Sequence, residues 1–150
     1  MKKVYDTINQ YCVEHELLTN GDGIVIGLSG GMDSVCLLQV LAALRNEWQL
    51  RLVCVHVHHG IRGTAADEDA AFAQRLAAKY NISFRLYEMD IPQLAKEQGL
   101  SEEEAGRNYR YRCFEEVRKE LNFDKIAVAH HRDDQAETVL WQILRGSGLR

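Results

Sequence analysis

The sequence predicts an α/β fold in which an open, parallel sheet carries helices on both faces. Short apolar runs alternate along the chain with longer segments of helical period, and this alternation is typical of parallel strands joined by crossover helices. The run at residues 24–29 is continuously apolar, as expected for a strand covered on both faces. The chain has 150 residues, of which 46% are hydrophobic and 27% charged. We therefore expect one globular domain over residues 1–150.

The first half of the chain begins with apolar residues at helical spacing, which predict an opening helix. Gly21 and Gly23 then mark a turn before the first apolar run. Gly30 and Gly31 end that run, and a segment of helical period follows directly. The expected elements are a helix at residues 2–18, a strand at 24–29, a helix at 33–47, a strand at 50–59 and a helix at 67–80.

The second half continues the alternation and contains clear helix-start signals. Pro92 lies near the start of a short helix, where proline is tolerated. Ser101 and Glu104 form a capping box for the next helix, which ends in the basic segment RKEL. The expected elements are a strand at residues 82–89, helices at 90–98 and 101–121, a strand at 125–130 and a closing helix at 134–145.

Composition excludes several classes of protein. The formal net charge is −4, which argues against a surface that binds nucleic acid by bulk attraction, although it leaves open a local basic patch or a partner domain. The four cysteines form no CxxC pair, so reduced, buried thiols are favoured over disulfides or zinc. No window is apolar enough for a signal peptide or a membrane span. We expect a cytoplasmic protein.

Polar, chemically capable residues gather where three of the expected strands end. They lie at Ser29–Ser34, at His56–Gly63 and at His130–Glu137. Because ligands of such sheets bind beyond the carboxyl ends of the strands, these segments predict one shared site.

The segment SGGMDS is built to hold a phosphate group. A turn on two glycines can direct backbone amides into one concavity, and the following helix adds the positive end of its dipole. The lysine of the common phosphate loop is missing, so Asp33 could instead bind Mg²⁺. The alternative makes Asp33 or Ser34 an ordinary N-cap and the glycines a tight turn. The residues expected to bind the nucleotide are Ser29, Gly30, Gly31, Met32, Asp33 and Ser34.

SGGMDS resembles the SGGxDS signature of the PP-loop ATP pyrophosphatases. The resemblance implies a Rossmann-like fold of the adenine nucleotide alpha hydrolase type, with ATP and Mg²⁺ as cofactors. It also implies cleavage of ATP into AMP and pyrophosphate, with the adenylate step activating a carbonyl oxygen.

Three further segments narrow the resemblance to the tRNA(Ile)-lysidine synthetase family. They are VHVHHGIRGTAADEDAAFA, SEEEAGRNYRYRCF and AHHRDDQAETVLWQILRGSGL. His58 departs from this family's pattern, since asparagine is common there, and so does Arg132. The resemblance implies a ligase that adenylates C2 of the wobble cytidine in tRNA(Ile) with a CAU anticodon and then joins L-lysine to it. Its members continue with further tRNA-binding domains, so we expect residues 1–150 to form the PP-loop domain alone.

The resemblance also assigns roles to single residues. It gives lysine recognition to Asp134 and Glu137, which three-residue spacing would place on one helix face, although such acids can simply complement the helix dipole. His131 is expected to contact the nucleotide. Arg110, beside the apolar stripe of its helix, is expected to contact the lysine substrate. The expected catalytic residues are Asp33, His131 and Arg110. Weaker candidates are Arg107 and Arg62, while His130 is expected to pack in the core.

Other functions remain open at this stage. A tRNA-thiolating PP-loop enzyme would also activate a pyrimidine carbonyl, but it needs reactive cysteines or an iron–sulfur cluster. A non-catalytic ATP-binding module would release no pyrophosphate. The histidines at positions 56, 58, 59, 130 and 131 lack the spacing of a zinc site. The sequence leaves the oligomeric state open, a homodimer included.

Overall fold

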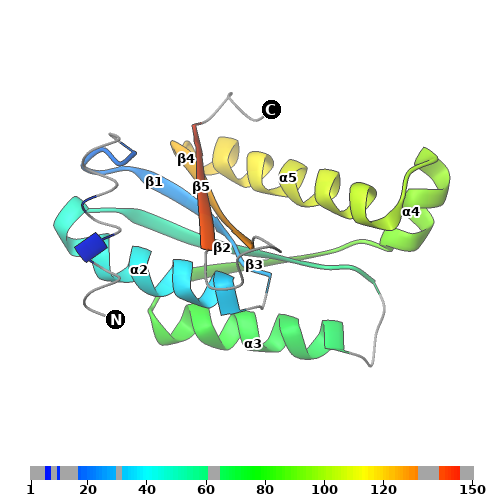
Figure 1. Cartoon of the computed structure of the whole chain (residues 1–150), viewed down its shortest axis with the longest axis horizontal. Coiled ribbons are helices and arrows are strands. Elements are labelled where there is room, and N and C mark those ends of the chain that lie inside the picture. Colours follow the sequence, from blue (N-terminus) through cyan, green and yellow to red (C-terminus); the bar gives the residue numbers. More distant parts are fainter. Residues whose placement is uncertain are drawn as a thin grey trace.

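Five strands form one sheet in the order β3-β2-β1-β4-β5 (Figure 1). The computed structural model describes residues 6–7, 10, 17–29, 32–60, 65–131 and 139–145. The strands are β1 (Gly23–Gly27), β2 (Arg51–His58), β3 (Ser83–Glu88), β4 (Lys125–His131) and β5 (Val139–Arg145). The helices are α2 (Met32–Trp48), α3 (Ala65–Lys79), α4 (Ile91–Gln98) and α5 (Glu102–Leu121).

The strands β3, β2, β1 and β4 are all parallel, as the sequence predicts. The central strand β1 pairs with β2 and with β4, and β2 pairs with β3. Since each of these strands enters the sheet in the same direction, their carboxyl ends share one edge. The turn after β1 and the ends of β2 and β4 therefore meet in space.

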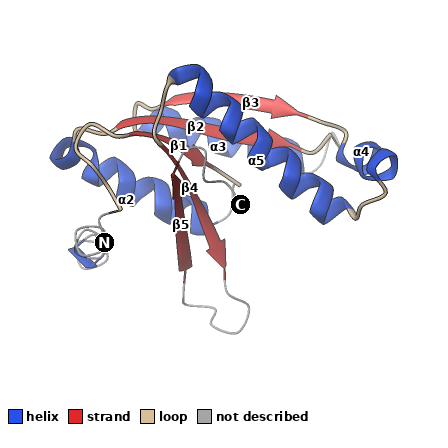
Figure 2. Ribbon diagram, turned by 90° about the horizontal axis from the view of Figure 1, so that it is seen from above, coloured by secondary structure: helices blue, strands red, loops and turns tan. Residues whose placement is uncertain are grey.

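The two faces of the sheet bury different residues of β1. Ile24 and Ile26 belong to a core shared with α2 and α3, whereas Val25 belongs to a second core shared with α5. All three side chains are fully buried, because alternate side chains of a strand point to opposite faces. Figure 2 shows α5 across one face of the sheet and α2 on the other side. The predicted helices on both faces are confirmed.

The predicted closing helix at residues 134–145 is wrong for its described part. Residues 139–145 form β5, which runs antiparallel to β4 from the pair Lys125–Arg145 to the pair His131–Val139. Val139, Trp141 and Ile143 are residue types that favour strands. A short connection can join antiparallel neighbours, whereas a parallel strand needs a crossover. The apolar residues of this segment are spaced as in a helix, but pairing with the edge strand β4 outweighs that spacing.

N-terminal caps mark the starts of α4 and α5, close to where the sequence predicts these helices to begin. The Ser101 hydroxyl accepts a hydrogen bond from the Glu104 amide at 3.1 Å, which confirms the cap of α5. Asp90 caps α4 through the Gln93 amide at 3.0 Å, with Pro92 in the first turn. Of the predicted opening helix, residues 6–7 and 10 are helical, and most of the remainder lies outside the described residues. No helix in the described part of the chain is long and apolar enough to cross a membrane.

Candidate functional site

A cavity of about 470 Å³ opens at the carboxyl edge of the sheet. It is bounded by the ends of β1, β2 and β4, by the first turns of α2 and α3, and by the middle of α5. Its polar lining includes Ser29, Ser34, His56, Asp69, Arg107 and Arg110. The structure therefore brings together the serines of the glycine loop and the arginines of α5, which are about half the chain apart in the sequence.

The start of the glycine loop is held by a short hydrogen-bond network. The Leu28 amide donates to the Val55 carbonyl at 2.9 Å, and the Ser29 amide donates to the Ser34 hydroxyl at 3.0 Å. The two serine hydroxyls lie 2.8 Å apart. Ser34 is only 3% exposed, so its hydroxyl supports the loop from inside. The Ser29 amide and hydroxyl thus both contact the Ser34 hydroxyl at the start of the loop.

The helix α2 begins at Met32, directly after the glycines. The first amides of a helix have no partner within it, and the helix dipole makes this end positive. Ser34, in the first turn, lines the cavity, so this helix end adjoins the cavity. Gly30 and Gly31 and the side chains of Met32 and Asp33 lie outside what the structure describes. The assignment of Mg²⁺ to Asp33 remains a prediction.

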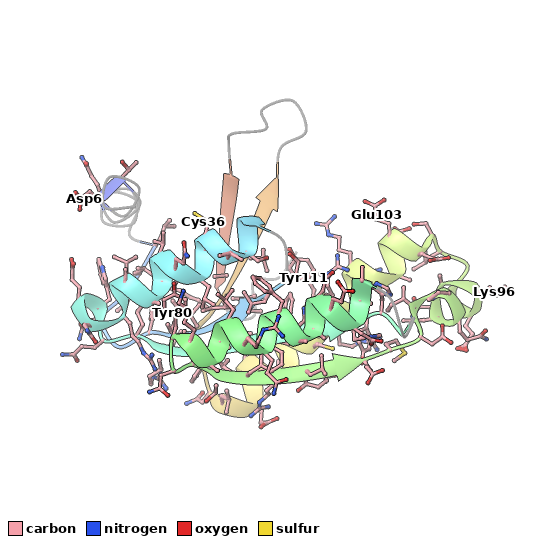
Figure 3. All side chains as sticks on the ribbon, turned by 90° about the horizontal axis from the view of Figure 1, so that it is seen from below. Asp6, Cys36, Tyr80, Lys96, Glu103 and Tyr111 are labelled. Atoms are coloured by element: carbon pink, nitrogen blue, oxygen red, sulfur yellow. The ribbon has the colours of Figure 1, made fainter. Side chains whose placement is uncertain are left out.

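Two arginines of α5 line the opposite wall of the cavity. The Arg107 guanidinium carbon lies 5.8 Å from the centre of the Tyr111 ring. Glu103 and Tyr111, both labelled in Figure 3, lie on the same helix and line the same cavity. Among the described residues, no carboxylate lies within 4.0 Å of either Arg107 or Arg110. An arginine without a carboxylate partner is well suited to bind an anionic ligand.

Arg110 occupies space that a glycine leaves open. A Cβ added to Gly106 would lie 3.3 Å from Nη1 of Arg110, so the guanidinium lies back along the helix over the preceding turn. Arg110 is exposed, yet partial burial of its guanidinium lowers its pKa and the charge of Arg107 lowers it further, while Tyr111 raises it. Glu103 opposes this shift. The site is thus locally positive.

His56 begins a segment that the sequence predicts to join the site, but no role for this residue was predicted; it lines the cavity. Its ring is 5% exposed, and Nδ1 lies 2.6 Å from the Leu28 carbonyl oxygen. Because that oxygen can only accept, Nδ1 carries the proton of the neutral ring. Burial lowers the pKa of His56, and the nearby His58 and His59 lower it further. The sequence contains one indication of this role, because a histidine stands inside an apolar segment near the carboxyl end of the second strand.

His58, in contrast, supports the chain after β2. Its Nε2 lies 2.6 Å from a carboxylate oxygen of Asp67, and its Nδ1 accepts a hydrogen bond from the Gly60 amide at 2.9 Å. Both ring nitrogens are therefore occupied, and the neutral ring donates through Nε2. Within the described ranges, no three histidine, cysteine, aspartate or glutamate side chains form a group that could hold a metal ion.

Several predicted site residues cannot be placed in the cavity. His131 was expected just past the fourth strand, but it is the last residue of β4 and pairs with Val139. His130 likewise lies within β4, and the side chains of both histidines lie outside the described part of the structure. Asp134, Glu137 and Arg62 fall entirely outside the described residues. Their roles remain predictions.

The thiols of Cys54 and Cys113 are poor nucleophiles. Burial raises the pKa of Cys54 to about 12. Burial also raises the pKa of Cys113, against a smaller opposing effect of a hydrogen bond with Tyr109. The thiolate is the nucleophilic form of cysteine, so neither residue is suited to transfer sulfur.

Comparisons with known proteins agree with this geometry. The chain is similar to the tRNA(Ile)-lysidine synthase of Caldanaerobacter subterraneus subsp. tengcongensis, with 49% identity over 150 residues that make up 100% of this chain and 31% of that protein. It is also similar to the tRNA(Ile)-lysidine synthase of Clostridium tetani, with 41% identity over 97% of this chain and 30% of that protein. The chain thus spans about a third of the length of these relatives.

Two solved structures share the fold at low sequence identity. The U34-tRNA thiolase NcsA from Methanococcus maripaludis, solved with its [4Fe-4S] cluster, matches with a TM-score of 0.66 and 20% identity over 87% of this chain and 46% of that chain. The NH3-dependent NAD synthetase from Campylobacter jejuni matches with a TM-score of 0.60 and 19% identity over 83% of this chain and 54% of that chain. A family model described as the PP-loop domain matches residues 2–150. The chain therefore belongs to the PP-loop domain family.

Proposed function

We propose that this chain is the ATP-binding catalytic domain of an enzyme that joins L-lysine to C2 of the wobble cytidine in tRNA(Ile) with a CAU anticodon. The observation that carries the proposal is the cavity in which Ser29 and Ser34 lie across from Arg107 and Arg110. It combines an anion-binding helix end with two arginines that have no carboxylate partner among the described residues. The identity of 49% to a tRNA(Ile)-lysidine synthase supports the choice of lysine and tRNA(Ile) as substrates.

The reaction proceeds in two steps. The C2 oxygen of cytidine attacks the α-phosphorus of ATP, and pyrophosphate leaves. The ε-amine of lysine then attacks C2, AMP leaves with the oxygen, and the amine loses a proton. Both leaving groups are anions, so a positive surface stabilises charge that develops as each bond breaks.

Residues on two walls of the cavity bind different parts of the reacting groups. The amides at the start of α2 and the Ser29 hydroxyl bind the pyrophosphate portion of ATP. Arg107 and Arg110 bind a phosphate oxygen or the adenylated base from the other side. Mg²⁺ would neutralise phosphate charge, and a carboxylate such as that of Asp33 is chemically suited to hold it.

The amine-binding part of the proposal rests on residues beyond the described ranges. We assign lysine to Asp134 and Glu137, because carboxylates pair with ammonium groups and one of them can accept the proton that lysine releases. We assign His131, at the end of β4, to the nucleotide. Within the same proposal, tRNA(Ile), lysine and ATP are the partners and the cytoplasm is the location.

Thiolation is the nearest competing activity, since a thiolase shares this fold. A sulfur-transfer enzyme needs a thiolate or a cluster held by cysteines. Cys54 and Cys113 have raised pKa values and are buried in separate parts of the core. Cys54 and Cys113 are therefore poorly suited to sulfur transfer, which favours the amine-transfer proposal.

The decisive experiment is mass spectrometry of the wobble nucleoside after incubation of the full-length protein with ATP, isotopically labelled lysine and tRNA(Ile). A mass increase that carries the lysine label supports the proposal. A sulfur-sized increase would instead identify a thiolase. ATP binding with no pyrophosphate release in the presence of lysine and tRNA would identify a non-catalytic module.

A further inference from the structure

His56 is a buried histidine that lines the cavity, and one of its two ring nitrogens has a hydrogen-bond partner. Nδ1 donates to the Leu28 carbonyl at 2.6 Å, at the point where β1 ends and the glycine loop begins. The ring is 5% exposed and lines the cavity. Among the described residues, no group forms a hydrogen bond with Nε2.

The hydrogen bond from Nδ1 to the Leu28 carbonyl determines whether Nε2 can donate or accept a hydrogen bond. Since the proton of the neutral ring is on Nδ1, Nε2 carries a lone pair and can only accept a hydrogen bond. A buried acceptor without a donor destabilises the folded state. A ligand with an N–H or O–H group would remove that cost.

The charges around the ring decide whether it remains an acceptor. Burial lowers the pKa of His56 most, and His58 and His59 lower it further, whereas the hydrogen bond to Leu28 and the charge of Asp69 raise it. The balance keeps the ring neutral and Nε2 available.

We propose that His56 is a nucleotide-binding residue: Nδ1 holds the start of the glycine loop in place, and Nε2 accepts a hydrogen bond from an amino or hydroxyl group of ATP. This inference rests on the proposed binding of ATP in the cavity. The nucleotide is the ligand because His56 contacts the first residue of the loop that binds its phosphates. The donor is either the amino group of adenine or a ribose hydroxyl.

Two substitutions separate the functions of the two ring nitrogens. In His56→Asn, the side-chain amide can still donate to the Leu28 carbonyl, but nothing replaces Nε2. In His56→Gln, the longer amide can reach the position of Nε2 and present its oxygen as an acceptor. The measurements are nucleotide affinity by calorimetry and the midpoint of thermal unfolding, both in the full-length protein.

The probes are ATP, inosine triphosphate, 2′-deoxy-ATP, 3′-deoxy-ATP and pyrophosphate. We expect His56→Asn to bind ATP about tenfold more weakly than the original protein, and His56→Gln to recover part of that loss. One analogue should bind the original protein and His56→Asn equally, and the group it lacks identifies the donor. Pyrophosphate should bind both proteins equally.

Three outcomes would overturn the inference. His56→Asn could bind ATP as tightly as the original protein, in which case Nε2 contacts no nucleotide. All the probes, pyrophosphate included, could weaken together with the unfolding midpoint, in which case His56 only supports the fold. The Michaelis constant for lysine alone could change, in which case the donor is not on the nucleotide. If the original protein itself binds no ATP, the proposed function fails as well.

Discussion

The guanidinium of Arg110 lies over Gly106, one turn earlier in α5, so that a Cβ on Gly106 would come within 3.3 Å of Nη1. Glycine inside a helix costs about 1 kcal/mol relative to alanine. The other close neighbour, Cγ2 of Ile91, is at an ordinary contact distance of 3.6 Å. The space at Gly106 therefore serves the position of Arg110.

Replacement of Gly106 by alanine should separate stability from function. We expect Gly106→Ala to unfold at the same temperature as the original protein or a higher one, and to bind ATP or tRNA several-fold more weakly because Arg110 is displaced. Thermal unfolding and steady-state kinetics measure the two effects. Asn108→Ala, at an exposed position of the same helix, is the matched control and should leave kinetics unchanged. Unaltered kinetics in Gly106→Ala would show that Arg110 tolerates the shift.

A buried ion pair at the opposite edge of the sheet should be important for stability and neutral for binding. Nζ of Lys125 lies 2.6 Å from Oδ2 of Asp22, and each side chain is 8% exposed. Lys125 also donates to the Leu17 carbonyl at 2.6 Å. We expect Lys125→Met to lower the free energy of unfolding by about 3–5 kcal/mol, measured by urea denaturation. Adding Asp22→Leu should restore much of it, and a double variant as unstable as the single one would contradict this account.

The hydroxyl of Ser34 should be required for the shape of the glycine loop. In Ser34→Ala the Ser29 amide loses its acceptor, so we expect ATP affinity to fall about tenfold. Ser34→Thr keeps the hydroxyl and should bind ATP nearly as the original protein does. Calorimetry with ATP checks both variants. Equal affinity in Ser34→Ala would mean that the loop holds its shape without this bond.

The lowered pKa of His56 should make the fold sensitive to acid. The ordinary value is 6.5 and the folded value lies below it, so the unfolded chain binds more protons as the pH falls below 6.5. The stabilising effect is complete above the unfolded value and is lost as the pH falls through the folded one. Urea midpoints between about pH 8 and about pH 5 should therefore decline less steeply in His56→Asn. Identical slopes would exclude His56 as the titrating group.

The thiol of Cys54 should resist alkylation in the folded protein. Its pKa of about 12 leaves almost no thiolate near neutral pH, and the side chain is fully buried. Mass spectrometry of the Cys54 peptide after iodoacetamide treatment should show labelling only when denaturant is present. Rapid labelling of Cys54 in the folded chain would show a reactive thiol and would support sulfur transfer instead.

Local signals in the sequence determined much of the scaffold. The Ser101 cap, Pro92 in the first turn of α4 and the glycine pair after β1 each act within a few residues, so adjacent residues suffice to predict them. The continuous apolar run of β1 likewise reports burial on both faces. These features determined the parallel α/β class and the edge at which the site lies.

Tertiary structure alone decided how the site is assembled. The bond from His56 to the Leu28 carbonyl depends on the register of β1 against β2, and the pairing of β5 with β4 overrode a helical spacing. The sequence shows that Arg110 lies beside the apolar stripe of its helix, which predicts a functional role. Its position across the cavity from Ser34, however, depends on the packing of α5 on the sheet. Such contacts join residues far apart in the chain, and their geometry follows from strand register and helix packing, which no local pattern encodes.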